Sequence, residues 1–101
     1  MRIRLAPQAL SDLDEIWIYV AQKSGNAEIA TRLIGSISRR FELLAKFPYI
    51  GRALETSKQP GIRTLVARNY IVFYRPADGE IRILRVIHAA RDAYAVFAEE
   101  R

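Results

Sequence analysis

Cysteine is absent from this chain of 101 residues, which excludes disulfide bonds and thiolate metal sites and suits folding in a reducing compartment. No apolar run reaches the length of a signal peptide or a transmembrane helix, so we expect a cytoplasmic protein without membrane contact. The sequence also lacks a phosphate-binding glycine loop, a serine nucleophile elbow and any metal-ligand spacing. These absences predict no metal and no cofactor, and they make the chain a weak candidate for an enzyme.

Positive charge is in excess over the whole chain. The formal net charge is +5, and residues 52–91 hold eight Lys or Arg against three acids. Such a surface favours an acidic partner, either an acidic protein or, as the secondary expectation, nucleic acid. A basic surface without a dedicated partner is the alternative. Half of the residues are apolar, so residues 1–101 are expected to form one globular domain.

Two amphipathic helices are predicted in the first half. After a short alternating strand at residues 1–5, Pro7 suits the first turn of a helix that ends at Ser24-Gly25. A second helix follows the N-cap Asn26 and ends before Pro48. With so short a link, the two are expected to form an antiparallel hairpin. The expected buried stripes are Leu10, Leu13, Ile16, Trp17 and Val20 on the first helix, and Ile29, Leu33, Ile37, Phe41 and Leu44 on the second. The acidic residues Asp12, Asp14 and Glu15 are interpreted as complementing the dipole of the first helix.

Residues 62–92 are rich in β-branched and aromatic side chains and predict a three-strand meander. Asn69-Tyr70 separates the first two strands, and the turn 76–79 separates the last two. The last strand is apolar on both sides, which is typical of a central strand. Its two faces are expected to be Ile81, Ile83 and Ile87 on one side, and Leu84 and Val86 on the other.

The remaining segments complete the predicted architecture. Residues 48–61 are expected to be a loop, and residues 91–98 are compatible with a short C-terminal helix or with a tail ordered by a partner. The order β-α-α-β-β-β, with that optional last helix, predicts an α+β fold. An N-terminal strand and an antiparallel helical hairpin would pack on a mainly antiparallel sheet.

The histidine His88, flanked by Arg85 and Arg91, is the most specific candidate for chemistry. An imidazole between two guanidinium groups could act as an acid or a base on a phosphodiester. A structural role at the end of a core strand is the favoured alternative, because one residue type does not make a site. The surrounding arginines could bind phosphates, with tyrosines stacking on bases, or their stems could cover the edges of the sheet.

Four motifs occur in order along the chain. They are A-x-x-D-L-x-x-I-x-x-Y from Ala9 to Tyr19, L-x-x-x-P-x-x-G-R from Leu44 to Arg52, RNYIVFYR at 68–75 and ILRVIHAARD at 83–92. Together they resemble the ParE branch of the ParE/RelE superfamily of bacterial type II toxin–antitoxin toxins, over nearly the whole chain from Leu5 to Asp92.

The resemblance implies a toxin that inhibits DNA gyrase by binding and is neutralised by a small ParD-like antitoxin. It assigns antitoxin binding to Trp17, Ile34, Phe41 and Tyr74, and target binding to Arg63, Arg75, His88, Arg91 and Tyr94. No catalytic residue is assigned on this interpretation. The alternative is a RelE-like, ribosome-dependent mRNA endoribonuclease, whose catalytic set would be Arg68, Arg85, His88, Arg91 and Tyr94.

Overall fold

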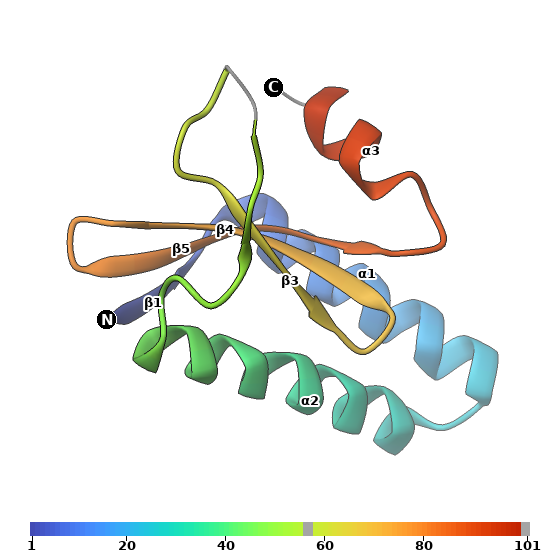
Figure 1. The fold of residues 1–101 in the computed structure, drawn as a ribbon. Coiled ribbons are helices and arrows are strands. Elements are labelled where there is room, and N and C mark those ends of the chain that lie inside the picture. Colours follow the sequence, from blue (N-terminus) through green and yellow to red (C-terminus); the bar gives the residue numbers. More distant parts are fainter. Residues whose placement is uncertain (56–57, 100–101) are drawn as a thin grey trace.

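A helical hairpin lies along one face of a five-stranded sheet, and a short third helix packs on the other face (Figure 1). The computed structural model describes residues 1–55 and 58–99. In chain order the elements are β1 (Arg2–Leu5), α1 (Pro7–Ser24), α2 (Ala27–Lys46), β2 (Arg52–Ala53), β3 (Arg63–Ala67), β4 (Tyr70–Ala77), β5 (Glu80–His88) and α3 (Ala93–Glu99). The predicted α+β class and the order β-α-α-β-β-β are therefore confirmed.

The strand order is β1-β5-β4-β3-β2. β3, β4 and β5 form the predicted antiparallel meander, while β1 pairs in parallel with β5, with Ile3 opposite Ile81. The short strand β2 lies within residues 48–61, which were expected to be a loop, and it pairs with β3. β5 therefore lies between two strands, as its apolar character on both faces predicted.

The helix ends follow local sequence signals. Pro7 opens α1, and Gly25 closes it with a left-handed φ of 68°, which glycine adopts without steric cost. The side chain of Asn26 caps α2 by accepting a hydrogen bond of 2.9 Å from the backbone N–H of Glu28. No helix in residues 1–55 and 58–99 is long and apolar enough to cross a membrane.

The buried stripe of α1 is rotated relative to the predicted one. Ala9 and Asp12 are buried and Leu13 and Ile16 pack on the core, whereas Leu10 is exposed. The prediction failed because it counted only apolar side chains. The small Ala9 allows close contact with the core, and Asp12 is buried because a cation on β5 pairs with it. Asp12 lies beyond the first turn of α1, so the helix-dipole interpretation of this residue was wrong.

A β-bulge changes the faces of β5. Phe73 pairs with Arg85 but Tyr74 pairs with Ile83, which leaves Leu84 as an extra residue in β5. One extra residue reverses the alternation beyond it. Val86 therefore joins Ile81 and Ile83 in the core under the hairpin, while Ile87 joins Leu84 beneath α3. The predicted assignment of Val86 and Ile87 to faces was wrong for this reason.

Candidate functional site

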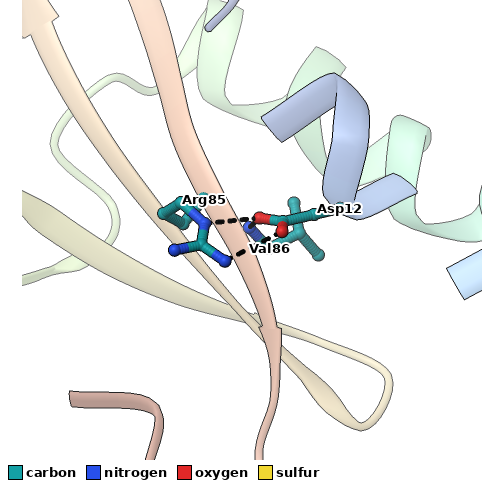
Figure 2. Close-up of polar contacts among 3 residues, drawn as sticks. All are labelled: Asp12, Arg85 and Val86. Atoms are coloured by element: carbon teal, nitrogen blue, oxygen red, sulfur yellow. Dashed lines mark hydrogen bonds and ion pairs between the residues drawn. The ribbon is translucent and has the colours of Figure 1, made fainter. Parts of the chain in front are cut away.

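Asp12 and Arg85 form a buried ion pair that joins α1 to β5 (Figure 2). Arg85 Nε and Nη2 donate to the two carboxylate oxygens of Asp12 at 2.8 and 2.9 Å, and the backbone N–H of Val86 donates to Oδ2 at 2.8 Å. Bidentate geometry and three charge-assisted hydrogen bonds compensate for the loss of hydration of both charges. Arg85 therefore serves to hold the helix on the sheet, and its guanidinium is directed into the protein.

A concavity of about 440 Å³ opens beside this pair, between α1 and the end of β5. Its lining includes the polar side chains of Glu15, Tyr19, Tyr70, His88 and Arg91. His88 Nδ1 accepts a hydrogen bond of 2.9 Å from the backbone N–H of Ala90, so Nε2 is the ring nitrogen left for a ligand. The structure thus brings His88 and Arg91 to one site, as their spacing in the sequence suggested.

Tyr70 is one of the residues that line this concavity. Its ring meets the imidazole of His88 edge to face, with the ring centroids 5.0 Å apart. Burial raises the pKa of the Tyr70 hydroxyl above its ordinary value, and the neighbouring Tyr19 raises it further. Tyr70 is therefore a neutral hydrogen-bonding group at physiological pH and not a base.

Tyr74 organises the segment that follows α2. Its fully buried side chain donates to the carbonyl of Pro48 at 2.9 Å and accepts from the backbone N–H of Gly51 at 2.9 Å. A Cβ at residue 51 would lie 2.5 Å from the Thr64 carbonyl oxygen and 2.6 Å from Tyr74 Oη, so only glycine fits. Pro48 and Gly51 of the second motif and Tyr74 of the third motif thus form one contact.

Arg63 belongs to the same contact. Its Nη1 donates to the carbonyl oxygens of Gly51 at 2.6 Å and Tyr49 at 3.2 Å, and its guanidinium lies 5.1 Å from the centroid of the Tyr49 ring. These bonds use the side chain to fix the segment 49–51. These bonds occupy Nη1, so the predicted role in target binding would fall to the other N–H groups of the guanidinium.

The other residues of the two predicted sets are dispersed. Tyr94, a residue of α3, packs on Phe73 on the sheet face opposite the hairpin, and Arg75 lies beside Gly61. Arg68 Nη2 instead donates to Ser36 on α2 at 3.2 Å. Arg68, Arg85 and Tyr94 therefore do not converge with His88 and Arg91, and the five residues do not form one catalytic constellation in this structure.

The four residues assigned to antitoxin binding also divide. Trp17 is partly exposed and its indole N–H donates to Thr31 Oγ1 at 3.1 Å, while Ile34 packs against the edge of the core. Phe41 and Tyr74 are buried within the core under the hairpin. Both side chains are buried here, so neither offers an exposed surface to a partner, and their assignment to antitoxin binding stays a prediction.

Comparison with known proteins assigns the chain to a family. The family model described as "ParE toxin of type II toxin-antitoxin system, parDE" matches residues 3–93. This chain belongs to that family. The ParE-family chain is 33% identical over 92 residues to Toxin ParE1 of Caulobacter vibrioides, which covers 91% of the chain and 93% of that toxin. It is also 33% identical over 84 residues to Toxin RelE2 of the same organism, covering 83% of the chain and 90% of that toxin.

Solved structures agree on the fold. The toxin superposes on a chain of the chromosomal ParDE toxin–antitoxin system from P. aeruginosa with a TM-score of 0.73 and 28% identity, covering 87% and 95% of the two chains. A chain of the RelBE2 toxin–antitoxin complex from Mycobacterium tuberculosis gives 0.61 at 22% identity, covering 86% and 95%, and this likeness concerns the fold alone. The protein is thus a type II toxin–antitoxin toxin of the ParE/RelE superfamily.

Two contacts that shape this part of the molecule, Asp12 with Arg85 and Gly51 with Tyr74, were not predicted from the sequence. Asp12 was interpreted as complementing the helix dipole and as a motif position, and its pairing was not predicted because 73 positions separate it from Arg85. Gly51 and Tyr74 were quoted as parts of two different motifs, although they form one hydrogen bond. An aspartate within the inward stripe of an amphipathic helix was the available signal for the first of these, because a buried carboxylate requires a cation.

Proposed function

We propose that this toxin inhibits DNA gyrase by binding and that a ParD-like antitoxin holds it inactive. Membership of the ParE family and the likeness to a chain of the P. aeruginosa ParDE system support both parts. One structural observation carries the choice of binding over catalysis. Among the residues expected of a ribonuclease, Arg85 is buried in an ion pair and Tyr94 lies on the opposite face of the sheet from the hairpin.

Gyrase would be contacted at the end of β5 and on the surface that follows it. His88 and Arg91 line one concavity, with Nε2 of His88 and the exposed guanidinium of Arg91 available to a partner. Tyr94, on the opposite face of the sheet, and Arg75, beside Gly61, lie outside this concavity, so the proposed contact rests on His88 and Arg91. Arginine is enriched among the residues that carry binding energy in protein interfaces.

The antitoxin would cover the outer side of α1. Leu10, Trp17 and Ile18 are exposed there at the spacing i, i+7, i+8, which places them on one side of the helix. An apolar stripe of this kind on a basic protein suits an acidic amphipathic segment. We propose this exposed surface for the antitoxin in preference to Phe41 and Tyr74, whose side chains are buried.

Two assays run side by side test the target. With purified gyrase we expect accumulation of cleaved DNA or loss of supercoiling, while mRNA on translating ribosomes stays intact. Truncating His88 and Arg91 to alanine should weaken gyrase inhibition by about tenfold for each lost contact of about 1.4 kcal/mol. Arg2→Ala, which removes an exposed positive charge from β1, is the control and should change little. Cut mRNA with unaffected gyrase would refute the proposal.

The antitoxin surface has a matched pair of variants. Ile18 on α1 is 51% exposed and Ile50 after α2 is 50% exposed, so replacing either with serine removes the same chemistry at equal exposure. Ile18→Ser should weaken binding of the cognate antitoxin in calorimetry, whereas Ile50→Ser should leave it unchanged. Equal effects of the two variants would contradict the placement of the antitoxin on α1.

A ribosome-dependent endoribonuclease is the second candidate function. The similarity to Toxin RelE2 of C. vibrioides favours it, as does the pairing of an imidazole with a guanidinium at His88 and Arg91. On this hypothesis the substitution His88→Ala should lower cleavage by two or more orders of magnitude, in contrast to the graded loss expected of a binding surface.

A further inference from the structure

Two arginines from distant parts of the chain share one hydroxyl group on the outer surface of α2. Arg39 Nη2 and Arg68 Nη2 each donate to Ser36 Oγ at 3.2 Å. Arg68 lies in the turn between β3 and β4, which reaches α2 in space (Figure 1). Two cations are thus held at one neutral oxygen, which is an unfavourable arrangement of charge unless an anion joins them.

No carboxylate relieves this charge within residues 1–55 and 58–99. Neither Arg39 nor Arg68 forms an ion pair there, and the neighbouring Arg32 meets Glu28 only at 4.0 Å with both side chains exposed. Such an exposed pair contributes little. Arg40 adds a further positive charge as it donates to the Val66 carbonyl oxygen at 3.2 Å. The cluster Arg32, Ser36, Arg39, Arg40 and Arg68 is therefore a concentrated positive surface, named here the α2 arginine cluster.

The backbone of Arg68 points to a use for its side chain. Its φ of 57° lies in the left-handed region, which costs a residue with a Cβ free energy and which glycine or asparagine adopts more readily. The turn directs the guanidinium of Arg68 at Ser36 of α2. Strain at a residue whose side chain joins a charged cluster is the pattern of a binding site.

We propose that the α2 arginine cluster binds the phosphodiester backbone of duplex nucleic acid. Two guanidinium forks converging within hydrogen-bond reach of one point match the oxygens of a phosphate group, and Ser36 Oγ–H can donate to the same group. The adjoining surface recess is lined by Ile29, Arg32, Leu33 and Arg68, none of which offers a ring on which an unpaired base could stack. A duplex presents its phosphates without that requirement, and contacts of this kind carry no sequence preference.

The proposal stands apart from the gyrase and antitoxin assignments, because binding to nucleic acid is measured with the toxin alone. Fluorescence anisotropy of a short labelled duplex DNA would be recorded between about 50 and 200 mM salt, the range over which phosphate contacts weaken strongly. The double variant Arg39→Gln/Arg68→Gln should bind at least tenfold more weakly at the lower salt concentration. The slope of log K against log salt should become shallower by about one, since the two arginines contact one phosphate group and about 0.9 counterion is released for each phosphate contact.

Two control variants separate a built site from net charge. Arg2→Gln/Arg52→Gln removes the same charge from exposed residues at the two edges of the sheet and should bind duplex DNA nearly as the unaltered chain does. Arg39→Lys/Arg68→Lys keeps the charge but loses the planar forks, and it should still weaken binding several-fold. Equal losses in the cluster and edge variants would overturn the proposal, as would full binding by the lysine variant.

Competing probes decide the class of ligand. Labelled single-stranded DNA and RNA should bind no more tightly than the duplex, and inorganic phosphate should compete only weakly. An acidic peptide that displaces the duplex at equal charge concentration would overturn the assignment to nucleic acid, and would identify the cluster as a surface for an acidic protein. Absence of measurable duplex binding at low salt would overturn it as well.

Discussion

The carboxylate of Asp12 and the guanidinium of Arg85 meet through two hydrogen bonds of 2.8 and 2.9 Å, although 73 positions separate them. Asp12 also accepts a hydrogen bond from the backbone N–H of Val86, two residues beyond Leu84, the extra residue of the bulge in β5. One side chain of α1 thus satisfies both a buried cation and a backbone group at an irregular point of the sheet. This contact fixes α1 over β5, and with it the wall of the concavity that contains His88.

Removing the charge of Asp12 should be costly. Asp12→Asn nearly preserves shape but leaves the buried guanidinium of Arg85 without its counter-charge, so we expect the free energy of unfolding to fall by about 3–5 kcal/mol in urea denaturation. Asp14→Asn, on the exposed side of the same helix, is the matched control and should stay within about 0.5 kcal/mol. A small effect at Asp12 would mean that water reaches the pair.

The two glycines of the α2 region should respond in opposite directions to alanine. At residue 51 the new Cβ would meet the Thr64 carbonyl oxygen, which the β2–β3 pairing holds in place, so Gly51→Ala should destabilise by about 1–3 kcal/mol. At residue 35 the nearest side-chain atom lies 3.8 Å away, so Gly35→Ala should stabilise α2 by about 0.5–1 kcal/mol. Thermal unfolding of both variants measures the contrast. A stabilised Gly51→Ala protein would show that the segment 49–51 is not fixed by Tyr74.

Much of the fold could be predicted from the sequence because it depends on local signals. Pro7, Gly25 and Asn26 act within one turn of the helix ends that they define, and the β-hairpin turns depend on neighbouring residues. The assignment of residues to the two faces of β5 could not be predicted correctly. A bulge arises from the pairing of β5 with β4, and nothing in the sequence near Leu84 records it.

The site was less predictable than the fold for the same reason. His88 and Arg91 are three positions apart, and their meeting in one concavity follows from local geometry. Arg85 and Arg68 carry the same type of side chain as Arg91, yet one is buried with Asp12 and the other is held by Ser36 of α2. Their partners lie on elements distant in the chain, so the sequence could propose an arginine-rich site but could not sort its members.

The substitution Tyr74→Phe should lower the free energy of unfolding at neutral pH and change how this free energy depends on pH in alkaline solution. The variant removes one donor and one acceptor and leaves the Gly51 N–H without its partner, which should cost about 1–3 kcal/mol at neutral pH. Burial raises the pKa of Tyr74, outweighing the Gly51 hydrogen bond and the nearby charge of Arg63. Above the ordinary tyrosine pKa of about 10 the unfolded state therefore binds fewer protons than the folded state, and stability falls as pH rises.

The variant should lose this part of the alkaline dependence. Urea denaturation at neutral pH and above pH 10 checks both effects, and the stability difference between the two proteins should shrink as the pH rises. Tyr49→Phe, which alters an exposed tyrosine in the same segment, is the control. A constant difference across the whole pH range would contradict a raised pKa at Tyr74.

Substitution of Phe97 tests whether the C-terminal helix α3 is docked on the folded domain in the absence of a partner. The ring of Phe97 stacks on Phe73 with centroids 4.3 Å apart and planes 5° apart, and it is buried together with Ile62, Ile87 and Ala93. Phe97→Ala should cost about 3 kcal/mol or more if α3 stays docked, and less if the seven-residue helix detaches instead. Hydrogen exchange separates these outcomes, because detachment removes protection from the amide of Val96, which donates to the carbonyl oxygen of Asp92.

The control for this prediction is Tyr94→Ala. It removes a ring that is 47% exposed and meets Phe73 only edge to face, so it should lower the free energy of unfolding less than Phe97→Ala does. Equal losses would mean that α3 is held by its exposed side, leaving the buried stack without the role that its geometry indicates.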